Sequence, residues 1–183
     1  MKKAFLAMFV VSTTFAGANA FAADIGGGDG IIHFTGSITD KTCTVDAGDA
    51  DQTVNLGNVS SKAFTKAGDK ASPTAFKIDL TKCPATVDHV YVKFDGVSDT
   101  ANANLLAVDV SADEENPEAK GVGIEIADNT GKAIPLHTAS PSYAVDTTTN
   151  AATLNFVGRY VATAATVTVG PAKADSQFTI NYP

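Results

Sequence analysis

The amino-acid sequence predicts an all-β fold, and three features of its pattern support this prediction. Apolar and polar residues alternate in several short segments, which puts the apolar side chains on one face of an extended chain. Turn-forming residues separate these segments. Thr and Val, which favour strands, are abundant, and no segment has a convincing helical pattern. Together these features predict an antiparallel β-sandwich of immunoglobulin-like type.

The expected strands follow one another along most of the chain. Each has apolar residues at alternate positions and ends at a turn signal or a proline. We expect strands over residues 37–45, 53–59, 76–83, 89–94, 106–110, 121–128, 132–136, 154–163 and 176–182. We expect polar connections over residues 60–73, which can hold a short helical turn, and over residues 111–120 and 140–150.

The start of the chain has the pattern of an export signal. Lys2 and Lys3 precede an apolar run over residues 4–18, and small residues surround a cleavage position after Ala22, with Ala20 as the alternative. The apolar run is too short to span a bilayer comfortably. We therefore expect export into a bacterial periplasm and a soluble mature protein.

The mature chain has the length of one domain and an acidic balance. The formal charge is −7, and removal of the two lysines of the signal gives −9 (−7 − 2). This balance disfavours nucleic acid and anionic membrane as partners. We expect a signal peptide at residues 1–22, an N-terminal arm at residues 23–36 and one domain at residues 37–183.

Cys43 and Cys83 are the two cysteines of the chain, and both follow the export signal. In an oxidising compartment an isolated pair is most economically explained as a disulfide. The chain has no CxxC motif, and no spacing of Cys and His fits a zinc site. The predicted disulfide closes a loop of about forty residues, which contributes roughly 4 kcal/mol in the chain-entropy model.

The arm combines two properties that rarely occur together. Three glycines at residues 26–28 make a poor helix and a weak strand, yet residues 30–36 alternate as a strand does. His33 falls on one face of this segment. The opposite face comprises Gly30, Ile32, Phe34 and Gly36. Our hypothesis is that this strand pairs with another molecule, and that its own domain lacks a strand of the same kind.

With these motifs in order, the mature chain resembles the structural subunits of chaperone–usher pili, most closely the major rod subunits of type 1-like fimbriae. The arm and the two cysteines resemble the family's donor strand and disulfide. GVGIEIAD at residues 121–128 resembles a recurrent strand of the family, and FVGRY at residues 156–160 resembles its F-x-A-R-Y motif, with Gly158 where alanine is common. Gly170, fourteen residues from the end counted inclusively, and the penultimate Tyr182 match its C-terminal motif.

The resemblance implies an immunoglobulin-like fold that lacks its seventh, C-terminal strand. A periplasmic chaperone covers the resulting groove, and at the outer-membrane usher the arm of the next subunit replaces it. The resemblance also implies that Ile32 and Phe34 anchor the arm, that Gly30 passes a constriction, and that the product is a fimbria at the cell surface. The residues expected to face the chaperone or the groove are Gly170, Phe178, Ile180, Tyr182 and Pro183.

Two other classes of function were weighed against this one. His33, His89 and His137 lie in no recognisable nucleophile or metal motif, so we expect no enzyme, metal site or cofactor. The acidic residues 113–115 could bind a cation, but a solvated loop is the simpler interpretation. A minor subunit or adaptor remains an alternative, as does a freestanding β-sandwich binding module, which would fold as a monomer without needing the arm.

Overall fold

The computed structural model describes residues 32–36, 38, 42–110 and 113–183. The chain divides into two units, Met1–Ile38 and Thr39–Pro183, and the fold described here is that of the second unit. The predicted export signal lies outside the described residues. Within those residues, no helix is long and apolar enough to cross a membrane.

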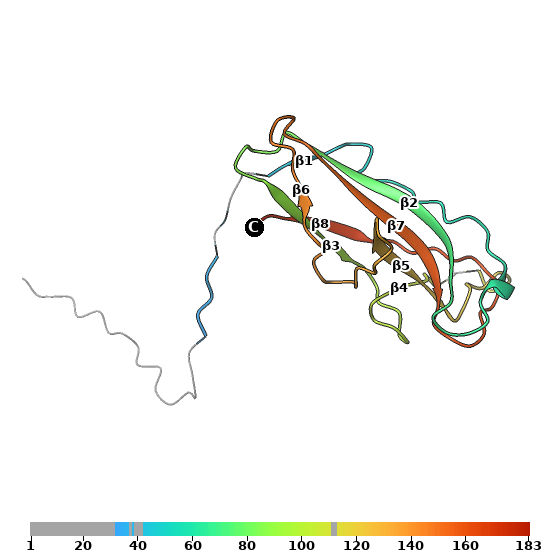
Figure 1. Ribbon diagram of the computed structural model, residues 1–183. Coiled ribbons are helices and arrows are strands. Elements are labelled where there is room, and N and C mark those ends of the chain that lie inside the picture. The colour runs from blue at the N-terminus through green and yellow to red at the C-terminus, as the bar shows by residue number, and fades with distance from the viewer. Residues whose placement is uncertain (1–31, 37, 39–41, 111–112) are drawn as a thin grey trace, which may run out of the picture. The chain divides into compact units, whose positions relative to one another are not determined.

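The regular secondary structure described in the second unit is almost entirely antiparallel strands in two sheets (Figure 1). One sheet has the strand order β1-β2-β7-β5-β4, and the other has the order β6-β3-β8. The strands are β1 Thr44–Val45, β2 Lys70–Thr81, β3 His89–Asp95, β4 Leu106–Ala107, β5 Val122–Asp128, β6 Tyr143–Ala144, β7 Ala152–Ala162 and β8 Gln177–Asn181, and a short 3-10 helix, η1, spans Ser61–Ala63. The architecture confirms the predicted all-β sandwich.

The core lies between the two sheets and is centred on one aromatic side chain. Phe156 of β7 is 1% exposed, and its ring centroid lies 5.4 Å from that of Phe76 on β2. From the other sheet, the rings of Phe94 on β3 and Tyr143 on β6 lie 5.1 and 5.4 Å from it. Burial of Tyr143 raises its pKa to about 12. These contacts join the sheets at the positions where the alternating pattern points inward.

The predicted strand at residues 53–59 is wrong. Its alternation is present over residues 53–57, because Val54 is half-buried and Leu56 is buried while the residues between and beside them are exposed. Among the described residues, however, no strand pairs with this segment. An extended chain forms a ladder only where a neighbouring strand offers its main-chain groups. Because residues 53–59 have no such neighbour in the described part of the chain, they pack against the sheet mainly through their side chains.

Other strand boundaries differ from the prediction in smaller ways. β2 begins at Lys70 instead of residue 76, and the predicted strands at 37–45 and 106–110 are reduced, in the described part, to β1 and β4. Residues 132–136 return beside β5 through the hydrogen bonds Asp128 N–Lys132 O and Ile134 N–Ile126 O, both 2.9 Å, without forming a strand. The short strand β6 lies in a predicted loop.

Cys43 and Cys83 form the predicted disulfide, with their Cα atoms 4.1 Å apart. The bridge lies beside the β1–β2 ladder, in which Thr44 pairs with Thr81. Both sulfur-bearing side chains are buried in the main core. The disulfide thus fastens the first residues of the domain to the end of a central strand.

Removal of the disulfide tests this role. The double variant Cys43→Ser/Cys83→Ser should lose about 4 kcal/mol of unfolding free energy, because the unfolded chain regains the entropy of the open loop. Urea denaturation measures the loss. Treatment with a reductant should weaken the wild type by a similar amount and leave the variant unchanged, and a reductant-insensitive wild type would contradict the role.

Candidate functional site: an apolar groove and an exposed arm

An apolar groove with a volume of about 1360 Å³ runs across the second unit. Residues 49–59 form one wall, which we call the free wall, and residues 167–178 form the other, which we call the C-terminal wall. Between them, the inward-facing side chains of the central strands form the floor. The floor includes Phe76 and Ile78 of β2, Val122, Ile124 and Ile126 of β5, and Tyr160 of β7.

The C-terminal wall leads into β8, an edge strand. In the described part of the chain, β8 pairs with β3 alone, through the register Phe94–Phe178 and Val92–Ile180. Phe178 lines the groove. An edge of this kind presents unpaired main-chain groups and accepts an additional strand. The groove therefore has the composition of a site for an apolar extended segment.

Gly158 brings the free wall close to the floor. A Cβ atom at this position would lie 3.4 Å from Cδ2 of Leu56, 3.8 Å from Cγ1 of Val54 and 3.9 Å from Cε1 of Phe76. These are ordinary contact distances, so an alanine would fit and a larger side chain would displace Leu56. The side chains of the free wall consequently rest almost directly on the backbone of β7.

Gly170 lines the groove, as its place among the predicted groove residues implied, and it also lies where two backbone segments approach closely. A Cβ atom there would lie 2.2 Å from the Pro117 carbonyl oxygen and 2.7 Å from the Ala119 nitrogen. The C-terminal wall is hydrogen-bonded at the same place, because Ala119 N donates to Pro171 O over 2.9 Å. Glycine is required here for the close approach of two backbone segments.

The remaining C-terminal residues lie outside the groove. Ile180 and Tyr182 are half-buried and pack against the main core, and Pro183 is exposed. Cys43 N donates a hydrogen bond of 2.9 Å to the Tyr182 hydroxyl, which ties the end of the chain to the beginning of the domain. Of the five residues predicted to face a chaperone or the groove, the structure brings Gly170 and Phe178 to it. The chaperone role of all five stays a prediction.

The described residues of the arm expose their apolar side chains. Ile32 is 79% exposed and Phe34 is 91% exposed, whereas Gly30 lies outside the described residues. No atom lies within 4 Å of a Cβ built on Gly36. Ile38, which is fully exposed, continues the same face of alternating residues and was missed by the sequence analysis. The sequence signal that could have identified Ile38 is the alternation of every second residue, which continues past Gly36.

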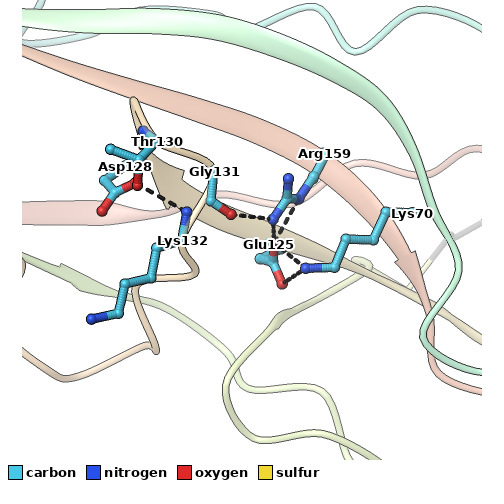
Figure 2. Close-up of polar contacts among 7 residues, drawn as sticks. All are labelled: Lys70, Glu125, Asp128, Thr130, Gly131, Lys132 and Arg159. Carbon is cyan, nitrogen blue, oxygen red and sulfur yellow. Dashed lines mark hydrogen bonds and ion pairs between the residues drawn. The ribbon is translucent and has the colours of Figure 1, made fainter.

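An ion cluster around the buried carboxylate of Glu125 holds the floor strands in register on their opposite face (Figure 2). Glu125 of β5 and Arg159 of β7 are ladder partners, and Arg159 Nε donates to Glu125 Oε1 over 2.6 Å. Lys70 Nζ lies 2.9 Å from Glu125 Oε2, and Arg159 Nη2 donates to the Gly131 carbonyl over 2.9 Å. Because side chains alternate along a strand, Arg159 points away from the groove while its neighbours Gly158 and Tyr160 line it.

Asp128 organises the turn that follows β5, as the dashed contacts of Figure 2 show in part. Its Oδ1 accepts from Thr130 Oγ1 at 2.6 Å, from Thr130 N at 2.9 Å and from Lys132 N at 3.0 Å. The hydrogen bond from the Thr130 side chain is the main cause that lowers the pKa of Asp128 below 3.8. The predicted turn at residues 128–131 is thereby confirmed, with Gly131 N donating to Asp128 O over 2.9 Å.

His137 belongs to a polar contact at the end of β3. Its Nδ1 lies 2.8 Å from Asp95 Oδ1, and its Nε2 lies 3.3 Å from Ser98 Oγ. The hydrogen bond to His137 is the largest of the causes that lower the pKa of Asp95. Ser176 Oγ donates to the Asp95 carbonyl at 3.0 Å, so the cluster also fixes the start of β8. Across the described residues, no three His, Cys, Asp or Glu side chains converge as metal ligands would.

Comparison with known proteins gives consistent matches. A family profile described as fimbrial protein matches residues 32–183. The chain is 41% identical to a long polar fimbria protein A of Salmonella typhimurium, over 100% of this chain and 97% of that protein. It is 37% identical to a type 1 fimbrial subunit of the same species, over the full length of both.

Solved structures agree at the level of the fold. A type I fimbria protein and antigen of Burkholderia pseudomallei is 36% identical and superposes with a TM-score of 0.57, over 81% of this chain and 94% of that one. The P pilus rod subunit PapA is 20% identical and superposes with a TM-score of 0.61, over 77% of this chain and 99% of that one, which shows a common fold.

The β-sandwich with an apolar groove beside its last strand defines the class of incomplete sandwiches that accept a strand. Within that class, the chain belongs to the fimbrial protein family. It is a structural subunit of a cell-surface fimbria.

The ion cluster predicts unequal effects of its two cations. Arg159→Met should cost about 3 kcal/mol of unfolding free energy, because it leaves the Glu125 carboxylate buried with reduced compensation. Lys70→Met is the matched control. The Lys70 side chain is 43% exposed, so its loss should cost under about 1 kcal/mol. Urea denaturation at pH 7 measures both, and equal losses would contradict the dominant role of Arg159.

The turn predicts a dependence of stability on pH. The pKa of Asp128 is lowered on folding, so its stabilising contribution is complete above its unfolded pKa and is lost as the pH falls through the folded value. Asp128→Ala should therefore lower stability at pH 7 and show a shallower loss below about pH 4 than the wild type. Parallel pH profiles of the two proteins in urea denaturation would count against this assignment.

Proposed function

We propose that this chain polymerises by donor-strand exchange, in which its arm fills the groove of a second copy. The observation that carries the proposal is the combination of two features in one chain. The groove lies beside the edge of β8 that is unpaired in the described part of the chain, and Ile32 and Phe34 of the arm, with Ile38 just after it, are exposed apolar side chains at alternate positions. A strand with that pattern supplies what the groove lacks, namely main-chain partners and alternate apolar side chains.

The dimensions of the two parts support the match. Residues 30–38 span about 27 Å when extended, at about 3.4 Å per residue. In the free wall, residues 49–51 form a turn and bend, and residues 52–59, which contain neither, make a run of similar residue count. Burial of the three apolar side chains contributes roughly 1.5–3 kcal/mol each. Each new main-chain hydrogen bond adds about 1 kcal/mol.

An empty groove of this kind is an aggregation hazard, which implies further partners. We infer that a periplasmic chaperone covers the groove after export, and that an outer-membrane usher directs its replacement by the arm. The same reasoning divides the chain into a signal peptide at residues 1–22, an arm at 23–36 and a pilin domain at 37–183. Its task is structural and not catalytic.

Deletion of residues 24–35 tests the proposal. Expressed with its chaperone, the shortened protein should form a chaperone-bound subunit that does not polymerise, because its groove is intact and its donor strand is missing. A synthetic peptide of residues 24–38 should then displace the chaperone and give a stable monomer. Size-exclusion chromatography and gels of unboiled samples measure both outcomes.

Face-specific substitutions supply the control for the deletion. Ile32→Asp/Phe34→Asp should block polymerisation, since both charges would enter the apolar groove. His33→Asp/Thr35→Asp places the same charges on the opposite face and should leave assembly within a few-fold of the wild type. A shortened protein that is folded and monomeric without chaperone or peptide would refute donor-strand exchange.

A further inference from the structure

The two ends of the free wall are attached differently to the floor sheet. At its start, Asp79 N donates to Asp49 Oδ2 over 2.7 Å and Gln52 Nε2 donates to the Lys77 carbonyl over 2.9 Å. Residues 53–59 are held by much less hydrogen bonding. Among the hydrogen bonds of the described residues, a single one ties residues 53–59 to the floor, and it runs from Ser72 Oγ to the Leu56 carbonyl. The other polar contact of this stretch is local, from Gly57 N to Asn55 Oδ1 at 2.8 Å. Its remaining attachment is the packing of apolar side chains such as Leu56 on the floor.

Ser72 lies where β2 departs from regular geometry. The register between β2 and β7 shifts between Ala71 and Thr74, which marks a bulge. Within the bulge, Ser72 has a φ of 54°, in the left-handed region that residues other than glycine rarely adopt. Strained conformations of this kind persist where surrounding structure requires them. Here the conformation lets the hydroxyl reach the carbonyl of the free wall.

The C-terminal wall is also held by a hydroxyl of the floor that donates to a main-chain carbonyl of the wall. Tyr160 Oη donates to the Ala172 carbonyl over 3.0 Å, and burial raises the pKa of Tyr160, which keeps the hydroxyl protonated. In the ladder, Tyr160 is the partner of Ala71, the residue next to Ser72. Neighbouring positions of the floor therefore supply one hydroxyl to each wall. Ser72 donates to the free wall, and Tyr160 donates to the C-terminal wall.

We infer that the hydroxyls of Ser72 and Tyr160 are positioning groups that set the width of the groove and hold it ready for a strand from a second copy of this chain. The inference rests on the proposed function, which it deepens. A groove whose walls are already in place binds faster than one whose walls must be ordered during insertion. Once the strand is bound, its own ladder holds both walls, so the hydroxyls then matter less.

The two hydroxyls should not matter equally. The C-terminal wall has further main-chain bonds, from Ala119 N to Pro171 O at 2.9 Å and from Asp109 N to Lys173 O at 2.8 Å. Residues 53–59 of the free wall have only the hydrogen bond from Ser72 to the floor. Loss of the Ser72 hydroxyl should therefore slow strand uptake more than loss of the Tyr160 hydroxyl.

The experiment measures uptake of a fluorescent peptide of residues 24–38 by the mature full chain purified with its chaperone. Ser72→Ala should slow uptake about five-fold, the effect of one lost neutral hydrogen bond, and Tyr160→Phe about two-fold. Ser72→Gly is the matched control, because it removes the hydroxyl but relieves the left-handed strain. We expect it to be as slow as Ser72→Ala.

Two further measurements separate positioning from general stability. Limited proteolysis within residues 53–59 should be faster in both Ser72 variants before uptake, whereas the thermal unfolding of the peptide-filled proteins should stay close to that of the wild type. If Ser72→Gly and Tyr160→Phe took up the peptide at the wild-type rate, this inference would be overturned while the proposed function would stand. The inference would also be overturned if the variants lost as much stability with the peptide bound as without it. A wild-type protein that takes up no peptide would overturn the proposed function and the inference with it.

Discussion

Among the described residues, one edge of β8 and the free wall have no strand partner, and they lie on either side of the place where one strand is missing. Main-chain amides and carbonyls in an apolar setting must be partnered, and apolar side chains must be covered. The second unit meets both conditions around Phe156 and leaves both unmet along the groove. Three features of this chain relate to that missing strand. Gly158 lies under the free wall, and Gly170 lies where two backbone segments approach closely. The arm has apolar side chains that are exposed.

The two faces of the central strands serve this arrangement differently. On one face, β5 and β7 present the apolar floor of the groove. On the other, Glu125, Arg159 and Lys70 fix the strands to each other through the ion cluster around the buried Glu125 carboxylate (Figure 2). A buried ion pair adds little net stability compared with apolar packing, but its geometry specifies register. Register is what matters here, because a slip of one residue would turn Gly158 and Tyr160 out of the groove.

Period-two alternation is a local property, and it predicted the strands whose partners lie in the chain, such as β3, β5, β7 and β8. It also predicted a strand at residues 53–59, where the alternation is present but the ladder partner is not. The disulfide could be predicted because the chain has two cysteines and its predicted export signal directs it to an oxidising compartment. Ser72 and Tyr160 could not be identified this way, because a hydroxyl that reaches a carbonyl on a distant segment leaves no periodic signal. Ile38 was within reach, since the pattern continues past Gly36.

Side-chain hydroxyls are a fitting means of holding the walls of such a groove. A strand ladder would hold them more firmly, but it would use the main-chain amides and carbonyls that an incoming strand requires. A hydroxyl that donates to a carbonyl occupies one of its two lone pairs and leaves the amides of the wall free. Ser72 and Tyr160 each make this kind of contact, with Leu56 and Ala172. Residues 53–59 of the free wall are thus held in place while their main-chain groups, apart from Leu56 O and Gly57 N, stay available for a pairing strand.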